Sequence, residues 1–94
     1  FIFPFRYVWF AEADEIPSVE VLFSVPKKFH KRANKRNLLR RRIKEAYRLQ
    51  KQTLKNGSPA NLDLALIYSS KEVLPYKTIQ NAVRRILETV VEHL

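Results

Sequence analysis

The spacing of apolar residues changes several times along the chain and divides it into five predicted elements. β-Branched and aromatic residues dominate residues 2–10, and apolar side chains alternate with polar ones over residues 18–25, so both segments are predicted to be strands. Residues 62–69 form a third apolar, alternating strand. From residue 34 to about residue 55, and again from Pro75 to the end, apolar residues recur every three or four positions, which predicts two helices.

The order of these elements predicts the fold class. Pro26 ends the second strand, Asn34 is a suitable N-cap for the long helix, and residues 56–59 end that helix. Residues 11–18 form a surface connection between two antiparallel strands. A strand, a long helix and a strand make a crossover unit, so the third strand should pair in parallel with one strand of this first pair. We expect a single domain over residues 1–94: an α/β (α+β) two-layer sandwich with a small mixed sheet.

The two predicted helices differ in what they expose. On a helical wheel, the stripe of the long helix that faces the sheet is Leu39, Ile43, Ala46, Gln50 and Leu54, with Tyr47 at its margin. The neighbouring stripe is cationic and consists of Arg40, Lys44, Arg48 and Lys51, joined by Asn37, Arg41 and Lys55. The C-terminal amphipathic helix is predicted to serve packing alone, through Ile79, Val83, Ile86, Leu87, Val90, Val91 and Leu94.

Charge is concentrated on one segment of the chain. Residues 27–55 hold thirteen of the eighteen Lys and Arg residues against one acid, Glu45, a net charge of +12 in a chain whose total is +9. Clustered cations attract phosphates and release their counterions, so the segment predicts a binding site for a nucleic acid. The plainer interpretation, a basic helix with a solvated face, fits a more even mixture of acids and bases.

The start of the long helix is the strongest candidate for a phosphate site. Lys35 and Arg36 lie where the helix dipole and unpaired backbone N–H groups already create a positive potential, which an arriving anion would relieve. The residues predicted to contact RNA are Lys27, Lys28, Lys31, Arg32, Lys35, Arg36, Asn37, Arg40, Arg41, Lys44 and Arg48.

The first strand offers a second candidate surface. Alternation puts the rings of Phe3, Phe5, Tyr7 and Trp9 on one face of this strand. One interpretation is that these rings belong to the hydrophobic core. The other is that Trp9, with Tyr7 and Phe5, stacks on the unpaired bases of a single strand.

Several function classes lack the residues that they need. The chain has no cysteine, and His30 and His93 could not form a metal site without carboxylates, so we expect no metal or other cofactor bound by the protein. The acids lie in the 11–20 connection and on outer helix faces, so no catalytic residue is assigned and independent catalysis is not expected. No apolar run approaches the roughly 20 residues that span a bilayer, so we expect a cytoplasmic protein with no membrane partner.

The basic segment resembles the signature of the bacterial ribonuclease P protein subunit. In that family a strand ending in Val-Ser-Lys-Lys leads through a short basic loop to a helix that opens with Arg-Asn-Arg and later reads Arg/Lys-Glu-Ala-Phe/Tyr-Arg. The corresponding residues here are Val25-Pro26-Lys27-Lys28, Arg36-Asn37-Leu38, Arg40-Arg41-Arg42 and Lys44-Glu45-Ala46-Tyr47-Arg48. The DLALIY strand and the terminal helix also fit, so the resemblance covers nearly the whole chain.

The chain departs from the family pattern at four places. Leu38 stands in place of the second arginine of Arg-Asn-Arg, although Lys35 comes just before the motif. Pro26 replaces the usual serine, and the basic loop is longer than in the family and lacks its glycine. The helix that the family places before its first strand has no counterpart in this sequence.

The resemblance implies both a fold and a function. It implies that the strand-helix-strand crossover is left-handed, against the usual hand. It implies that the Arg-Asn-Arg helix binds the catalytic RNA subunit of ribonuclease P, and that the 5′ leader of precursor tRNA lies in a cleft between sheet and helix, near Trp9. The RNA, with Mg²⁺, would cleave the phosphodiester during tRNA 5′ maturation, with the protein as accessory subunit and no obligate protein partner.

Two alternatives stay open on the residues alone. A small ribosomal or other structural RNA-binding protein would use the same basic helix with no role in cleavage. A DNA-binding protein would place that helix in a major groove. The substrate distinguishes these classes.

Overall fold

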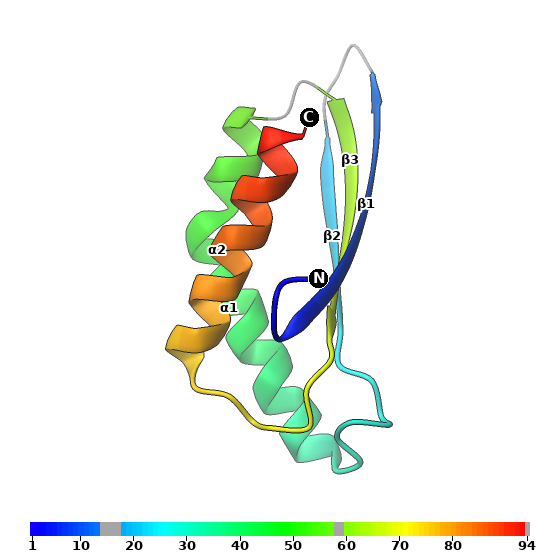
Figure 1. The fold of residues 1–94 in the computed structure, drawn as a ribbon, viewed down its shortest axis with the longest axis vertical. Helices are drawn as coiled ribbons and strands as arrows, with labels where there is room; N and C mark the ends of the chain where they lie inside the picture. The colour runs from blue at the N-terminus through cyan, green and yellow to red at the C-terminus, as the bar shows by residue number, and fades with distance from the viewer. Residues whose placement is uncertain (14–17, 58–59, 94) are drawn as a thin grey trace.

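In a computed structural model, the described residues are 1–13, 18–57 and 60–93 (Figure 1). The elements are β1 (Phe5–Ala13), β2 (Val19–Ser24), α1 (Ala33–Gly57), β3 (Ala60–Tyr68) and α2 (Tyr76–Glu92). The strands form one sheet in the order β1-β3-β2, in which β3 is antiparallel to β1 and parallel to β2. Both helices lie on the same side of this sheet, so the molecule has the predicted two layers (Figure 1).

The predicted fold class is confirmed, but the predicted neighbours in the sheet are wrong. β1 and β2 were expected to pair with each other, and instead β3 lies between them. The reason is the apolar character of β3, whose Leu62, Leu64, Leu66 and Tyr68 are all buried, which suits the central position in a sheet. The parallel pair of β2 and β3, joined through α1, is the predicted crossover unit. Its left-handed sense stays a prediction.

β1 begins and ends later in the chain than predicted. Ile2 and Phe5 close a tight turn, in which each backbone N–H donates to the other residue's carbonyl at 3.0 and 2.7 Å. Pro4 lies inside this turn, so the strand begins after it and runs for nine residues, into the segment that was predicted to be a connection. Residues 14–17 of that predicted connection lie outside the described part of the chain.

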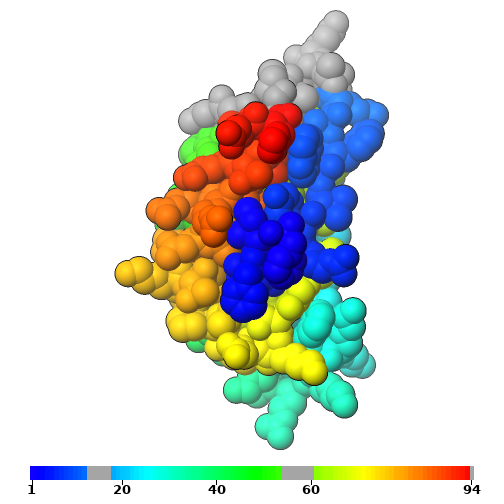
Figure 2. Space-filling model, in the orientation of Figure 1, coloured from blue at the N-terminus to red at the C-terminus, as the bar shows by residue number. Residues whose placement is uncertain are grey.

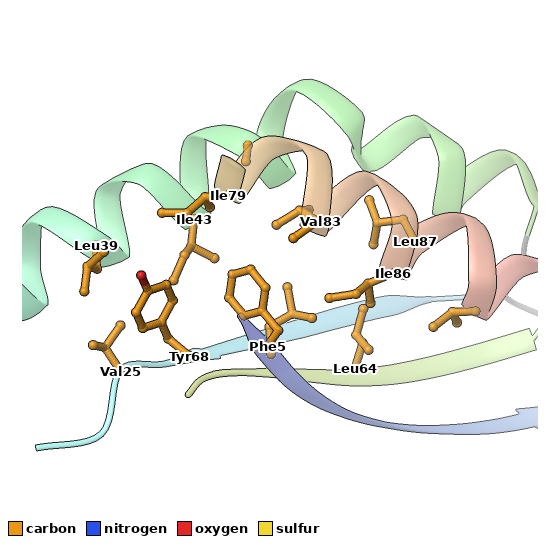
Figure 3. Packing of buried hydrophobic residues seen from close by; sticks show 14 of the residues in the cluster. Phe5, Val25, Leu39, Ile43, Leu64, Tyr68, Ile79, Val83, Ile86 and Leu87 are labelled. Atoms are coloured by element: carbon orange, nitrogen blue, oxygen red, sulfur yellow. The ribbon is translucent and has the colours of Figure 1, made fainter. Parts of the chain in front are cut away.

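The hydrophobic core lies between the helices and the sheet (Figure 3). Its aromatic centre is Phe5 and Tyr68, whose rings meet edge to face with centroids 5.7 Å apart. The predicted apolar stripes are confirmed, since Leu39, Ile43, Ala46, Ile79, Val83, Ile86, Leu87 and Val90 are all fully buried. Each such aliphatic side chain larger than alanine contributes about 1.5–3 kcal/mol by leaving water. The side chains of Leu54 and Leu94, predicted to join these stripes, lie outside the described residues.

The opposite face of the sheet carries no helix of the described chain. Because α1 and α2 pack against each other on one side, the alternate side chains of each strand face outward. Val8 and Phe10 of β1 and Leu22 of β2 are 61–67% exposed on this open face. The sheet therefore has one structural face and one face available to a partner.

Candidate nucleic-acid interface

The basic loop between β2 and α1, residues 26–32, occupies one end of the molecule, beside the segment that joins β3 to α2 (Figure 1). Its first half is a turn, in which the carbonyl of Pro26 accepts hydrogen bonds from the N–H groups of Phe29 and His30 at 3.2 and 3.4 Å. Lys27 and Lys28 lie at the exposed tip of the turn. The proline that ends the strand thus also organises the loop that carries the first cations.

His30 points inward from this loop. Its side chain is only 6% exposed, and its Nε2 lies 2.7 Å from the carbonyl oxygen of Ser70. A carbonyl can only accept a hydrogen bond, so Nε2 carries the proton and donates it. The imidazole also packs beside the ring of Tyr68, at a centroid distance of 5.7 Å. No sequence pattern predicted this contact, because Ser70 is forty positions away in the chain.

The side chain of Arg36, predicted to be a phosphate ligand, is partly occupied by hydrogen bonds within the protein. Its Nη1 donates hydrogen bonds to the carbonyl oxygens of His30 and Lys31, each at 2.9 Å, and the side chain is half-buried. Part of its guanidinium therefore serves to fasten the basic loop to the first turn of α1. For Arg36, predicted to bind phosphate, these local carbonyl oxygens therefore compete with an incoming phosphate.

The first turn of α1 is arranged as an anion site would be. The helix begins at Ala33, one residue before the predicted cap, because the carbonyl of Arg32 already accepts the N–H groups of Lys35 and Arg36, both at 3.2 Å. Asn34 still accepts the N–H of Lys35 through its side chain at 2.9 Å. The turn contains no acid to neutralise the positive end of the helix dipole.

The cationic stripe of α1 faces solvent, as predicted. Every residue predicted to contact RNA except Arg36 is exposed, and these residues are Lys27, Lys28, Lys31, Arg32, Lys35, Asn37, Arg40, Arg41, Lys44 and Arg48. Lys51 is half-buried, and the side chain of Lys55 lies outside the described residues. The fold brings the basic loop and this stripe together as one continuous surface, which is called the cationic surface below.

Within the described residues, the ion pair of Arg48 and Glu45, at 2.7 Å, is the one salt bridge on the molecule. The hydrogen bond and the charge of Arg48 lower the pKa of the Glu45 carboxyl, and the same contact raises the pKa of Arg48. Both side chains are exposed, so water and salt screen the pair and a phosphate can compete for Arg48. The remaining described cations of the loop and stripe have no carboxylate partner.

The aromatic rings predicted to stack on bases lie on the structural face of the sheet. Phe5 is fully buried, so its predicted contact with a base is wrong: no nucleotide can reach the ring (Figure 3). Tyr7 and Trp9 are half-buried and pack against the same core. The alternation along β1 was predicted correctly, but the helices cover the face that carries these rings. The exposed ring of the strand is Phe10 on the open face.

A groove lies where the open face meets the basic loop. It has a volume of about 520 Å³ and is lined by Phe1, Arg6, Tyr7, Val8, Pro26, Lys28, Phe29, Ile67 and Ser69. The ammonium of Lys28 lies over the ring of half-buried Phe29, 5.0 Å from its centre, so a cation and an aromatic ring lie together in the groove lining. The N-terminal residues lie against the segment after β3, where the N–H of Ser69 donates to the carbonyl of Pro4 at 2.8 Å (Figure 2).

A second groove, of about 570 Å³, lies further along the open face. Its apolar lining includes Val8, Phe10 and Leu22, and its charged residues are Glu20 and Asp63. These two acids face each other across β2 and β3. The open face is therefore positive beside the basic loop and negative toward its other end, so a polyanion is attracted to the first groove and repelled from the second.

Two other kinds of feature are absent from the residues that the structure describes. No three His, Asp or Glu side chains gather as they would around a metal ion. None of the helices combines the length and the apolar character that crossing a membrane would require. The candidate interface thus consists of the cationic surface and the groove beside it.

The chain is a small α+β protein with a mixed three-stranded sheet and two helices on one face of that sheet. Its cationic surface, at the loop before α1 and along that helix, presents positive charge to solvent. The family model described as Ribonuclease P matches residues 4–91, so the chain belongs to the ribonuclease P family. It is therefore a protein component of this ribonucleoprotein and takes part in tRNA 5′ processing. No curated protein and no solved structure matches the chain.

Proposed function

We propose that this protein is the accessory subunit that binds the catalytic RNA of ribonuclease P and the 5′ leader of precursor tRNA, and so assists Mg²⁺-dependent 5′ maturation. The observation that carries the proposal is the cationic surface, whose described residues include one cation paired with a carboxylate. A surface of unpaired cations is favourable only when an anionic partner neutralises it. Membership of the family supports RNA as this partner.

The catalytic RNA binds along α1 and the basic loop. Arg40 and Lys44 lie one turn apart on the exposed stripe, about 6 Å along the helix axis, with Arg41 and Asn37 beside them. The N–H groups at the start of α1 and the side chain of Lys35 extend the same surface. These contacts are made to phosphates, so they supply affinity and orientation rather than sequence preference.

The leader of precursor tRNA binds in the groove beside the basic loop. Single-stranded RNA needs an aromatic ring on which a base can stack and a cation for its phosphate, and Phe29, Lys28 and Arg6 offer both. Glu20 and Asp63 disfavour phosphates further along the open face. This location excludes Phe5, which is fully buried, whereas half-buried Tyr7 lines the same groove and half-buried Trp9 lines the second groove.

The RNA supplies the chemistry in this proposal. The RNA would hold the Mg²⁺, which would supply activation of the attacking water and stabilisation of the leaving oxygen. The protein neutralises phosphates that would otherwise repel each other when substrate and catalytic RNA meet, so less Mg²⁺ is needed. A cytoplasmic location and independence from other proteins belong to the same proposal.

The test is reconstitution with a bacterial ribonuclease P RNA and a precursor tRNA. At low Mg²⁺, adding the protein should allow cleavage at the mature 5′ end, whereas the protein without RNA should cleave nothing. Equal cleavage with and without the protein would contradict the proposal. A structural RNA-binding protein would bind the RNA in the same assay without increasing the rate of cleavage, which separates the main alternative.

A further inference from the structure

We propose that His30 is a positioning residue, which together with Arg36 fixes the basic loop in its RNA-binding conformation before any RNA arrives. The inference rests on the proposed function, because the loop is part of the cationic surface. It goes beyond that function by assigning a role to a buried side chain that would itself contact no nucleotide.

The cations of the basic loop repel one another, so the loop needs contacts that hold it in one conformation. Lys27, Lys28, Lys31 and Arg32 lie within six consecutive residues, so their mutual repulsion favours a spread, mobile loop. Ordering a backbone residue costs conformational entropy, which RNA binding would otherwise have to offset for each loop residue. A loop that is already ordered in the free protein binds more tightly for the same contacts.

His30 is the residue of this loop that points the other way. Its neighbours in the chain carry exposed cations, whereas its own ring is 6% exposed and reaches the carbonyl of Ser70 at 2.7 Å. Ser70 is itself buried, so without His30 its carbonyl would lose a partner in a place where water replaces it poorly. The hydrogen bond therefore ties the middle of the loop to the segment after β3.

Arg36 holds the same part of the loop through hydrogen bonds from the first turn of α1. Its Nη1 binds the carbonyl oxygens of His30 and Lys31, each at 2.9 Å, and it belongs to the first turn of α1. The loop is thus anchored to two separate elements within two residues. Both hydrogen bonds of Arg36 come from Nη1, so Nε and Nη2 of the guanidinium are not needed for this anchor.

The segment that receives His30 is itself braced. The hydroxyl of Tyr68 donates to the carbonyl of Glu72 at 2.7 Å and accepts the N–H of Leu74 at 3.3 Å. Arg42 of α1 donates to the carbonyl of Leu74. These hydrogen bonds hold the segment in one conformation, so the hydrogen bond from His30 to Ser70 restrains the loop as well.

The residues on either side of His30 connect the anchor to both proposed RNA contacts. Lys28 and Phe29 line the groove assigned to the leader, and Lys31 and Arg32 lead into the first turn of α1. Releasing His30 should therefore weaken the binding of single-stranded RNA and of the catalytic RNA together, although neither contacts the imidazole.

The experiment compares His30→Leu with His30→Gln. The amide nitrogen of glutamine can replace Nε2 as the donor to the Ser70 carbonyl, whereas leucine keeps the bulk and loses the donor. Binding of oligouridine and of a bacterial ribonuclease P RNA is measured over a range of salt concentrations, at a temperature where each variant is folded. His93→Leu, which removes an exposed histidine at the end of α2, is the matched control.

We expect His30→Leu to bind both RNAs about tenfold more weakly and to flatten the dependence of log K on log salt by about two charge units, because two loop cations lose their phosphates. His30→Gln should stay within about threefold of the unsubstituted protein, since each lost hydrogen bond and each lost phosphate contact is restored. His93→Leu should change neither affinity nor slope. A purely structural role of His30 would lower the melting temperature of His30→Leu and leave the salt slope intact.

A folded His30→Leu protein with unchanged affinity and slope would overturn the inference and leave the proposed function standing. Failure of the unsubstituted protein to bind either RNA would instead overturn the proposed function. If His30→Leu does not fold, Arg36→Lys tests the same anchor, because lysine keeps the charge but its ammonium lies one bond nearer the backbone than Nη1 and falls short of the two carbonyl oxygens. Full binding by Arg36→Lys would then reject the proposal, and a tenfold loss at constant charge would support it.

Discussion

The helices α1 and α2 pack side by side on one face of the sheet and bury similar apolar stripes, yet they present different surfaces to solvent. α2 exposes a mixture of both charges, with Lys77, Arg84 and Arg85 beside Glu88 and Glu92. The exposed cations of α1 include Arg40, Arg41 and Lys44, and the acid of that helix, Glu45, is occupied by Arg48.

The difference shows which properties the fold itself requires. α2 has the same structural task as α1 and performs it with a balanced outer surface, so packing on this sheet does not call for an excess of cations. Like charges along α1 repel each other and weaken the isolated helix by a few tenths of a kcal/mol for each close pair. The excess on α1 therefore belongs to binding, and the layer beneath both helices belongs to stability.

The largest effect should come from the shared core. Ile43→Ala on α1 and Ile86→Ala on α2 each remove a fully buried side chain and should lower the free energy of unfolding by about 2–5 kcal/mol. Urea denaturation measures the loss, and RNA titration under folding conditions should give unchanged affinity for both variants. A loss of affinity in folded Ile43→Ala alone would mean that the two sides of α1 are not separate in function.

The aromatic side chains under the helices should behave as core residues as well. Trp9→Ala should destabilise the protein by about 2 kcal/mol, less than a fully buried tryptophan would, because the ring is half-buried. Binding of oligouridine by the folded fraction should stay the same. Phe10→Ala, on the open face of the same strand, is the control and should change stability little. If Trp9→Ala instead weakened oligouridine binding at an unchanged urea midpoint, the tryptophan would be the stacking residue after all.

The comparison of the outer surfaces is tested by matched pairs of cations. Arg40→Gln with Lys44→Gln on α1 should weaken binding of the ribonuclease P RNA about tenfold and reduce the salt slope by about two charge units. Arg84→Gln with Arg85→Gln removes the same charge from α2 and should change neither quantity. Both double variants should keep their stability within about 0.5 kcal/mol, because all four side chains are exposed. Equal losses from the two pairs would mean that net charge, not the position on α1, determines binding.

The smallest effect is expected from alkaline pH. Burial raises the pKa of Tyr68 above its ordinary value of 10.0, and burial against β2 raises the pKa of Tyr47 in the same direction. The folded state thus holds these protons more tightly than the unfolded chain. The resulting stability is fully present below pH 10 and is lost as the pH rises through the pKa of the folded protein.

The free energy of unfolding, measured by urea denaturation from neutral pH to above pH 10, should therefore fall more steeply for the unsubstituted protein than for Tyr68→Phe. The difference between the two proteins should be less than about 1 kcal/mol. Phenylalanine cannot ionise, so the variant has no phenolate to bury. It starts from a lower stability at neutral pH, since Glu72 and Leu74 lose their hydrogen bonds to the hydroxyl. Parallel curves for the two proteins would show that Tyr68 does not contribute to alkaline unfolding.

Much of the fold was predictable because side-chain periodicity is a local property. The apolar positions of both helices and the alternation in β2 and β3 were predicted correctly, as was the exposure of the cations on α1. The cap was predicted two residues too late, since the carbonyl that starts α1 belongs to Arg32 rather than Asn34. The concentration of charge before and along α1 was enough to indicate a polyanion partner.

The arrangement of these pieces depended on contacts between distant parts of the chain. The alternation in β1 defined the two faces of the strand but not which face the helices would cover. For this reason Phe5 was included among the residues that could stack on RNA bases, although its side chain lies in the core. The position of β3 between β1 and β2 depends on pairing with both neighbours along its two edges, which no spacing within a single strand reveals.

The same distinction explains the candidate site. Local sequence decided which side chains are charged and on which side of their own helix they lie, because a helix fixes those relations within a few residues. Only the tertiary structure decided that His30 meets Ser70, that Arg36 binds the loop carbonyls and that a groove forms beside Lys28. These contacts depend on how separate elements pack, and that packing is set by the burial of the whole core rather than by any single segment.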